Sequence, residues 1–236
     1  MKKSLLLIAI LTSTFAVAVA NAATNLITDG TFSNSNVPAA DLYTSTSGYY
    51  YANGFGGNFH LTNPIVSDNP WIFVDGSGVI NGNTTAWGVP AGQQVAFIQS
   101  YIAPSGFDQF PSNAPSISQT FTTGTAGNYQ LTFDLANRTN WGGTESVNVL
   151  IDGVQQGSTL TALSGNLSLY TFSLNALNAN TNYTLEFAGV NPSTSDSTVF
   201  LDNVNVSAVP EPSEGALLLS GIGLIGFIAS RRNRKI

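Results

Sequence analysis

Apolar and polar residues alternate along several short stretches in the second half of the chain. The alternation has a period of two and recurs in five segments, 128–136, 147–151, 169–174, 182–187 and 198–206. This period is typical of half-buried β-strands. Asp152-Gly153 directly follows the second segment and is a turn signal for a short hairpin. No segment between the two ends of the chain has a convincing helical period, so the pattern predicts an all-β sandwich.

The first half predicts fewer strands, because Gly, Ser, Asn and Pro interrupt its apolar positions. We expect a short first strand with an Asp-Gly turn over 25–33, a buried strand over 71–76 with Trp71 in the core, and strands over 94–99 and 116–121. The segment 34–69 is rich in loop residues but contains three consecutive tyrosines, Tyr49–Tyr51. Aromatic residues in such a segment either pack beneath a long loop or line a binding face.

The N-terminus predicts a secretory signal peptide over residues 1–22. Lys2 and Lys3 form its positive region, Leu5–Leu11 its apolar region, and Ala20-Asn21-Ala22 the small-residue cleavage site.

The C-terminus predicts a membrane-spanning helix. Glu214 is the only charged residue in the 18 residues from Ser213 to Ser230, and a helix of that length spans about 27 Å, close to the thickness of a hydrocarbon core. The basic residues that follow, Arg231, Arg232, Arg234 and Lys235, should remain on the cytoplasmic side. The remaining 23–208 is predicted to be one β-sandwich domain, followed by a sorting segment at 209–236.

The C-terminal segment resembles the PEP-CTERM sorting signal of Gram-negative bacteria. The resemblance rests on Val209-Pro210-Glu211-Pro212, the glycine-bearing apolar segment and the terminal arginines Arg231 and Arg232. It implies processing by an exosortase near Pro210, Glu211 and Pro212, attachment to the membrane through the helix before processing, and delivery to the cell surface or extracellular matrix. The alternative is an ordinary anchor helix behind a proline-rich linker.

Charge changes the interpretation of the central domain. Six of the seven basic residues lie in the two terminal signals, so 23–208 has one cation, Arg138, against eleven acids, a net charge of −10. A surface with one cation cannot neutralise a row of phosphates, which excludes nucleic acid as a partner and disfavours anionic membranes. The absence of cysteine excludes disulfides and thiolate chemistry.

Catalytic chemistry has little support in the sequence. His60 is the only histidine, and no nucleophile elbow accompanies it. Three acids, Asp29, Asp75 and Asp152, stand in Asp-Gly pairs, where turn geometry explains them. We therefore predict a protein that is not an enzyme, with a divergent glycoside hydrolase as the remote alternative.

Carbohydrate binding is the sharper hypothesis, because sugar sites combine an aromatic platform with amide, carboxylate or guanidinium groups. The main candidates follow one predicted strand: Asn137, Arg138, Asn140 and Trp141. Tyr50 and Trp87 are secondary candidates. The alternative is that Trp141 folds over the end of the sandwich and Arg138 pairs with a nearby carboxylate.

Parts of the domain resemble carbohydrate-binding modules of the galactose-binding-like type. These are the opening Asn25–Ser33, the strands Gln94–Gln99 and Ser116–Phe121, and Leu201-Asp202-Asn203-Val204 in the last strand. The resemblance implies a jelly-roll β-sandwich and a structural calcium ion held partly by Asp202. Ser33 stands where the family has a glutamate that helps to hold this ion.

Three functions follow. The first is a non-catalytic exported protein of the cell surface or matrix that associates with extracellular polysaccharide. The second is a structural or adhesive biofilm protein that binds protein partners or itself. The third is the divergent hydrolase.

Overall fold

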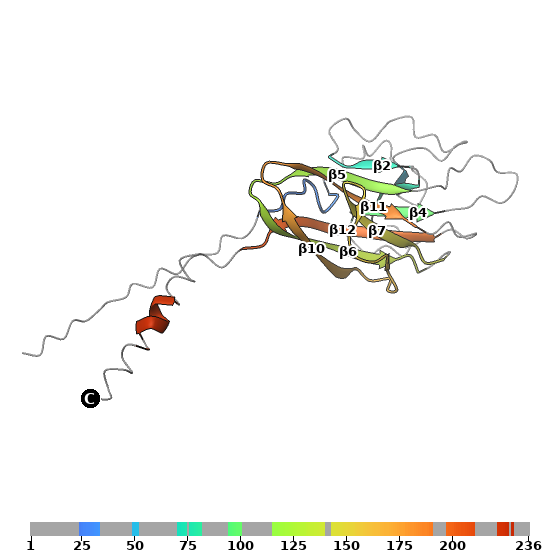
Figure 1. Ribbon diagram of the computed structural model, residues 1–236. Coiled ribbons are helices and arrows are strands. Elements are labelled where there is room, and N and C mark those ends of the chain that lie inside the picture. The colour runs from blue at the N-terminus through green and yellow to red at the C-terminus, as the bar shows by residue number, and fades with distance from the viewer. Residues whose placement is uncertain are drawn as a thin grey trace, which may run out of the picture. The chain divides into compact units, whose positions relative to one another are not determined.

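The chain contains two units. The computed structural model describes residues 24–33, 49–51, 70–74, 76–81, 94–100, 115–139, 143–190, 197–210, 221–226 and 228, with only the backbone at 49–51 and 81. One unit is Thr24–Val209, and the other comprises Met1–Ala23 with Pro210–Ile236. Within the second unit residues 221–226 are helical (Figure 1). No helix formed by the described residues is long and apolar enough to cross a membrane.

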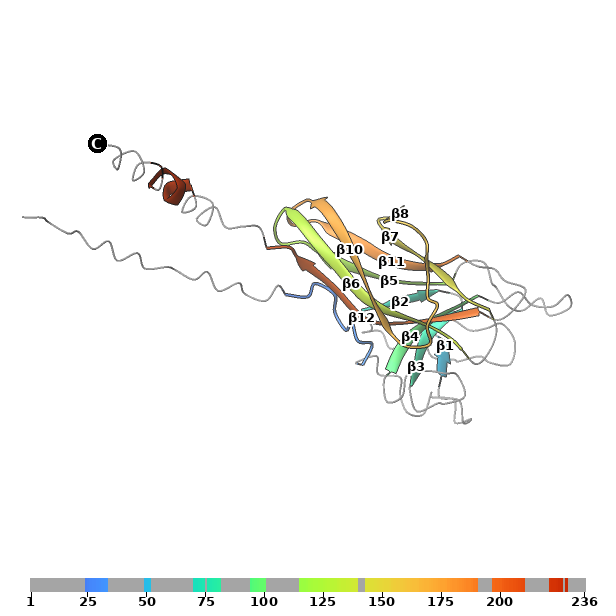
Figure 2. The ribbon, with the colours of Figure 1, turned by 90° about the horizontal axis from the view of Figure 1, so that it is seen from below.

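The first unit is a sandwich of two antiparallel sheets (Figures 1 and 2). Sheet 1 has the order β1 (Tyr49–Tyr51), β3 (Ser77–Asn81), β4 (Gln94–Ser100), β12 (Ser197–Ala208), β6 (Gly127–Asn137) and β10 (Ser168–Leu177). Sheet 2 has the order β2 (Ile72–Val74), β5 (Ser116–Thr122), β11 (Asn182–Gly189), β7 (Ser146–Ile151) and β8 (Val154–Gln155), and β9 (Leu160–Thr161) also pairs with β7.

The strand order is that of a jelly roll. From β4 onward the chain changes sheet at β5, β6, β7, β10, β11 and β12, and only β7, β8 and β9 follow one another within a sheet. The quartets β4-β12-β6-β10 and β5-β11-β7-β8 therefore face each other, which is the eight-stranded jelly-roll arrangement. The prediction of an all-β jelly-roll sandwich is confirmed.

The alternating segments of the second half all form strands, and the predicted hairpin is present. Ile151 pairs with Val154, so Asp152 and Gly153 form a two-residue loop. Both loop residues have positive φ, 49° and 78°, as a type I′ turn requires. This turn matches the right-handed twist of β7 and β8.

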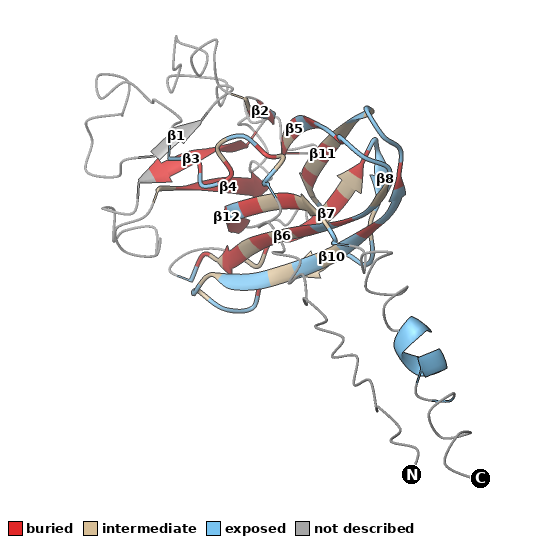
Figure 3. Cartoon of the chain, turned by 90° about the vertical axis from the view of Figure 1, so that its left-hand side faces the viewer, coloured by how far each residue is buried: buried red, intermediate tan, exposed pale blue. Residues whose placement is uncertain are grey.

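The core lies between the sheets and follows the predicted alternation (Figure 3). Tyr129, Leu131, Phe133 and Leu135 of β6 are all buried in it. A second buried cluster occupies the other face of sheet 1 and comprises Ile80, Val95, Phe97, Ala136 and Phe200. Because β4 contributes to both clusters, its residues from Val95 to Ser100 are buried without alternation.

The predicted first strand over 25–33 is wrong, since this segment forms turns. Its hydrogen bonds go to the last strand, where Asn25 Nδ2 donates to the carbonyl of Val204 (3.1 Å) and the amide of Val206 donates to Asn25 Oδ1 (3.0 Å). The amide of Val204 donates to the carbonyl of Gly30 (2.8 Å). A Cβ at Gly30 would lie 2.0 Å from the Val204 carbonyl oxygen, so this position requires glycine.

The same segment also contacts sheet 2. The side-chain amide of Gln119 in β5 accepts from the amide of Thr28 (2.8 Å) and donates to its carbonyl (2.9 Å). Trp71 Nε1 donates to the carbonyl of Asp29 (3.0 Å), and the Trp71 ring lies 5.0 Å from that of Phe32. Residues 24–33 thus connect the two sheets instead of extending either one.

The predicted buried strand over 71–76 is partly wrong. Trp71 is buried as expected, at 3% exposure, and so is Phe73. Ile72 is 63% and Val74 37% exposed, because β2 lies at the edge of sheet 2 and only one of its faces meets the core.

Candidate functional site

The end of β6 places two of the predicted carbohydrate-binding residues at one end of the sandwich. The amide of Asn137 donates to the carbonyl of Ser164 (2.7 Å), and the amide of Arg138 donates to the carbonyl of Thr198 (3.1 Å). Arg138 is only 7% exposed. The domain's one cation is therefore largely withdrawn from solvent.

A buried carboxylate lies at the same end. Glu145, which precedes β7, is fully buried. Its Oε2 accepts from Ser197 Oγ (2.8 Å) and its Oε1 from the amide of Val190 (3.1 Å). Arg138 and Glu145 are thus anchored to the adjacent residues Thr198 and Ser197 of β12, and both are buried.

Buried hydroxyl groups link the two sheets near Glu145. Ser77 Oγ of β3 donates to the carbonyl of Ser116 in β5 (2.8 Å), and the hydroxyl of Ser197 in β12 meets Glu145 before β7. We call Asn137, Arg138, Glu145 and Ser197 the polar end. Burial of polar groups is tolerated only when they are hydrogen-bonded. Here one buried acceptor, Asn137 Oδ1, has no hydrogen-bond partner in the structure.

The other predicted carbohydrate-binding residues are placed only in part. Asn140 and Trp141 lie outside the described residues, between Thr139 and Gly143. Gly143 forms an isolated bridge with Ser197, so both ends of this short connection are at the polar end. Trp87 also lies outside the described residues. The backbone of Tyr50 in β1 pairs opposite Val79 in β3.

A second polar site, the acidic site, lies further along β12 and contains the predicted calcium ligand Asp202. Asp202 pairs opposite Asp134 of β6, and the register shifts between Asp202 and Asn205. At this bulge Asn203 has φ 53°, and its side-chain amide donates to Asp134 Oδ2 (2.8 Å). The amide of Asn203 donates to Asp202 Oδ1 (2.8 Å).

The acidic site carries like charges. Asp202 is 3% exposed, and burial raises its pKa to about 6 against the opposing effect of the Asn203 hydrogen bond. The negative charges of Asp134 and Asp29 raise this pKa further. Around pH 6, Asp202 therefore changes between a neutral acid and an incompletely compensated carboxylate.

The described residues do not provide a full set of ligands for a calcium ion. They contain no group of three or more His, Cys, Asp or Glu side chains that could hold a metal, whereas calcium prefers six to eight oxygen ligands. A calcium ion at Asp202 stays a prediction, since further oxygen ligands would have to come from other groups.

Two features of these sites had no clear signal in the sequence. Glu145 stands among polar residues in Thr144-Glu145-Ser146, and nothing local distinguishes it from a solvent-exposed acid. The one available signal was its distance from Arg138: Glu145 follows seven residues later, so the two residues lie on the two sides of one short connection. The grouping of Asp29 and Asp134 with Asp202 depends on contacts between segments that are distant in sequence.

The C-terminal segment matches a known sorting motif. Residues 208–235 match the family model described as the PEP-CTERM protein-sorting motif, which confirms the resemblance seen in the sequence. The motif indicates an exported protein that is sorted through an exosortase. Of the predicted processing residues, Pro210 is described and belongs to the unit that contains the two termini. Glu211, Pro212, Arg231 and Arg232 lie outside the described residues. No curated protein matches the chain.

Solved structures similar to the chain include carbohydrate-binding modules. One is TmCBM61 in complex with beta-1,4-galactotriose (TM-score 0.44, 12% identity, covering 79% of this chain and 99% of that one). Others are CBM35 from Paenibacillus barcinonensis (0.39, 16%, 61% and 96%) and a family 35 module from Clostridium thermocellum (0.36, 13%, 59% and 98%). These likenesses are distant, and the jelly roll is defined by the chain's own strand order.

Proposed function

Since the chain carries a PEP-CTERM protein-sorting motif at 208–235, we propose that its sandwich is a non-catalytic domain that binds extracellular polysaccharide. Exosortase processing would deliver it to the surface or matrix of a Gram-negative bacterium. The ligand would bind at the polar end, over the connection that contains Trp141.

The observation that supports this proposal is the position of the polar end. Asn137 ends β6 and Arg138 follows it, and the connection with Asn140 and Trp141 begins after Thr139. A sugar offers apolar C–H faces to an aromatic ring and hydroxyls to amide and guanidinium groups. Asn137 Oδ1 has no hydrogen-bond partner in the structure but is buried, so it would have to become accessible before a sugar hydroxyl could satisfy it.

Electrostatics favours a neutral ligand at this end. Arg138, the only cation of the domain, is buried, so an anionic ligand would find little accessible positive charge. The net charge of −10 for 23–208 also opposes anionic polymers. A neutral glycan meets neither obstacle.

The two buried carboxylates, Glu145 and Asp202, support a role without catalysis. Glu145 is fully buried and both of its oxygens already accept hydrogen bonds. A glycosidase needs a pair of carboxyl groups on the two sides of a scissile bond in an accessible cleft. Neither Glu145 nor the buried Asp202 offers such access.

The test is binding of the purified chain to a glycan array and to exopolysaccharide. We expect Trp141→Ala to weaken binding by about tenfold or more, since loss of an aromatic platform costs of the order of 1.4 kcal/mol. Trp141→Phe is the matched control, because it keeps an aromatic face and should keep most of the affinity. The fold is monitored by circular dichroism and melting temperature. Absence of glycan binding by the unchanged chain, or equal binding by Trp141→Ala, would refute the proposal.

A further inference from the structure

The longest edge strand of the sandwich is unprotected. Sheets expose strands at their edges, and proteins commonly protect these edges by making them short or by adding charges, prolines or bulges. The other edge strands described here are short: β1 and β2 have three residues each, and β8 and β9 have two. β10 has ten residues and pairs only with β6.

The sequence of β10 contains none of the usual protective features over its first seven residues. Ser168–Leu174 has no charged residue and no proline, and it reads Ser-Leu-Tyr-Thr-Phe-Ser-Leu. Its register with β6 is continuous, and the irregularity comes only between Leu174 and Leu177. There Ala176 has φ 55° and donates its amide to Asn128 Oδ1 (3.1 Å). Such uncharged segments with high β-propensity pair readily with another strand.

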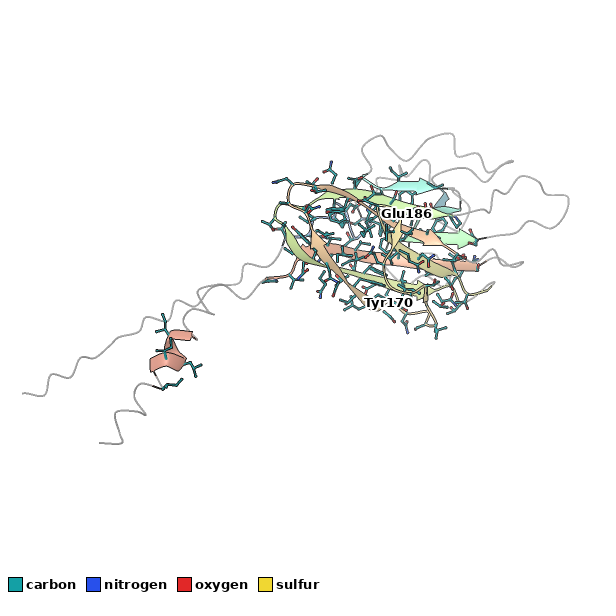
Figure 4. All side chains as sticks on the ribbon, in the orientation of Figure 1. Tyr170 and Glu186 are labelled. Carbon is teal, nitrogen blue, oxygen red and sulfur yellow. The ribbon has the colours of Figure 1, made fainter. Side chains whose placement is uncertain are left out.

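Apolar groups along β10 remain partly exposed, and no strand of the described residues lies beyond it (Figure 3). Tyr170 and Phe172 point to the core side and stack on Phe133, each with a ring separation of 5.8 Å. Both are nevertheless only half-buried, and Tyr170 lies at the margin of the sandwich in Figure 4. Leu169, on the opposite face, is 69% exposed.

We propose that β10 is a self-association site, at which Ser168–Leu174 of two copies of this chain pair antiparallel about Thr171. In this register Thr171 faces its own copy, Tyr170 faces Phe172, and Leu169 faces Ser173. Aromatic pairs and threonine pairs directly opposite each other are favourable cross-strand pairs. The contact is two-fold symmetric and closed, so it yields a dimer with one continuous sheet.

The strong negative charge of the domain does not oppose this contact. Among the described residues of β6 that pair with β10, the one acid is Asp134, which lies opposite Leu169. Two copies of Asp134 would be separated by at least three strand spacings, about 14 Å. This distance exceeds the Debye length of about 8 Å at physiological ionic strength. The inference is independent of glycan binding, which is assigned to the polar end.

The test uses the full chain, purified in mild detergent without glycan. We expect sedimentation to show a monomer–dimer equilibrium over roughly two decades of concentration, as a contact of this small size predicts. Thr171→Lys should weaken the dimer at least tenfold, because two ammonium groups would meet at the symmetry axis. Thr120→Lys is the matched control, since Thr120 is also an exposed strand threonine but lies on β5 of the other sheet.

Cysteine crosslinking tests the register itself, because the natural chain has no cysteine. Directly opposed residues have Cβ atoms about 5 Å apart, within reach of a disulfide. Thr171→Cys should therefore form a covalent dimer on oxidation, whereas Leu169→Cys should do so only when mixed with Ser173→Cys. A chain that stays monomeric throughout, a dimer unaffected by Thr171→Lys, or Thr171→Cys crosslinking no better than Thr120→Cys would each overturn the proposal.

Discussion

The last strand, β12, carries two buried polar sites with opposite electrostatic character. At its start, the polar end buries the cation Arg138 and the anion Glu145 next to Thr198 and Ser197. Five residues after Ser197, the acidic site buries Asp202 beside two further carboxylates. One strand thus holds one site with buried charges of both signs and one site with acids alone.

The difference follows from which strands flank β12 at each place. The polar end receives its anion from the segment before β7, in the opposite sheet. The acidic site receives Asp134 from β6 and Asp29 from the N-terminal segment, and the domain has no second cation to offset them. We conclude that the polar end should resist changes of pH and salt, whereas the acidic site should respond to them.

The largest expected effect is the removal of the anion at the polar end. Glu145→Ala should lower the free energy of unfolding by about 3 kcal/mol, because it removes a fully buried carboxylate that accepts hydrogen bonds from Ser197 Oγ and the Val190 amide, and a hydrogen bond to a charged group contributes about 1.5–3 kcal/mol. Denaturant unfolding followed by circular dichroism measures this loss. Glu145→Gln, which keeps one oxygen acceptor, should lose less. A loss below about 1 kcal/mol for Glu145→Ala would contradict the view that these buried hydrogen bonds stabilise the polar end.

A smaller effect with the opposite sign is expected at the acidic site on lowering the pH. The pKa of Asp202 is about 6 in the folded chain and about 3.9 in an unfolded one. Between these values the folded state binds the extra proton, so the contribution of Asp202 to stability is greatest below about pH 4 and is lost as pH rises through about 6. The slope should not exceed about 1.4 kcal/mol per pH unit.

Melting curves at pH 4 to 8 measure this dependence, and Asp202→Asn provides the control. The asparagine side chain can still accept from the Asn203 amide but carries no charge. The variant should be more stable than the natural chain at pH 7.5 and should lose the slope near pH 6. An unchanged slope in Asp202→Asn would assign the titration to another group.

The smallest expected effect is that of calcium. Cations reduce the repulsion among Asp29, Asp134 and Asp202, but the described residues do not complete a metal site. We therefore expect millimolar calcium to raise the melting temperature by no more than about 2 °C, and only above pH 6. A chelator should reverse the shift. Identical melting temperatures with calcium and with chelator would dismiss the predicted ion.

The sequence was sufficient for the strands with strict alternation and insufficient where long-range contacts decide. The alternation from Tyr129 to Leu135 predicted both the strand β6 and its buried face. Asp152-Gly153 predicted the turn between β7 and β8. By contrast, 25–33 has apolar residues suited to a strand but forms turns, because Asn25 and Gly30 satisfy the free edge of β12 after its bulge. No local pattern reports a partner more than 170 residues away.

The candidate site shows the same limit. Asn137 and Arg138 were identifiable because Arg138 is the only cation of the domain and follows a clear strand. Their burial was not, because it depends on Glu145, Ser197 and Thr198, which reach the polar end from other strands. Carbohydrate binding by these residues remains a proposal.

The attachment of the first residues of the sandwich to its last strand has a consequence for export. In a chain that leaves the cytoplasm N-terminus first, Asn25 emerges early, but its partners Val204 and Val206 lie 179 and 181 residues later. The jelly roll can close only when β12 has emerged, and by then the sorting motif that starts at residue 208 is next to pass. Completion of folding and recognition by the sorting machinery would then be nearly simultaneous. A chain truncated before β12 could not complete the fold and would also lack the sorting motif.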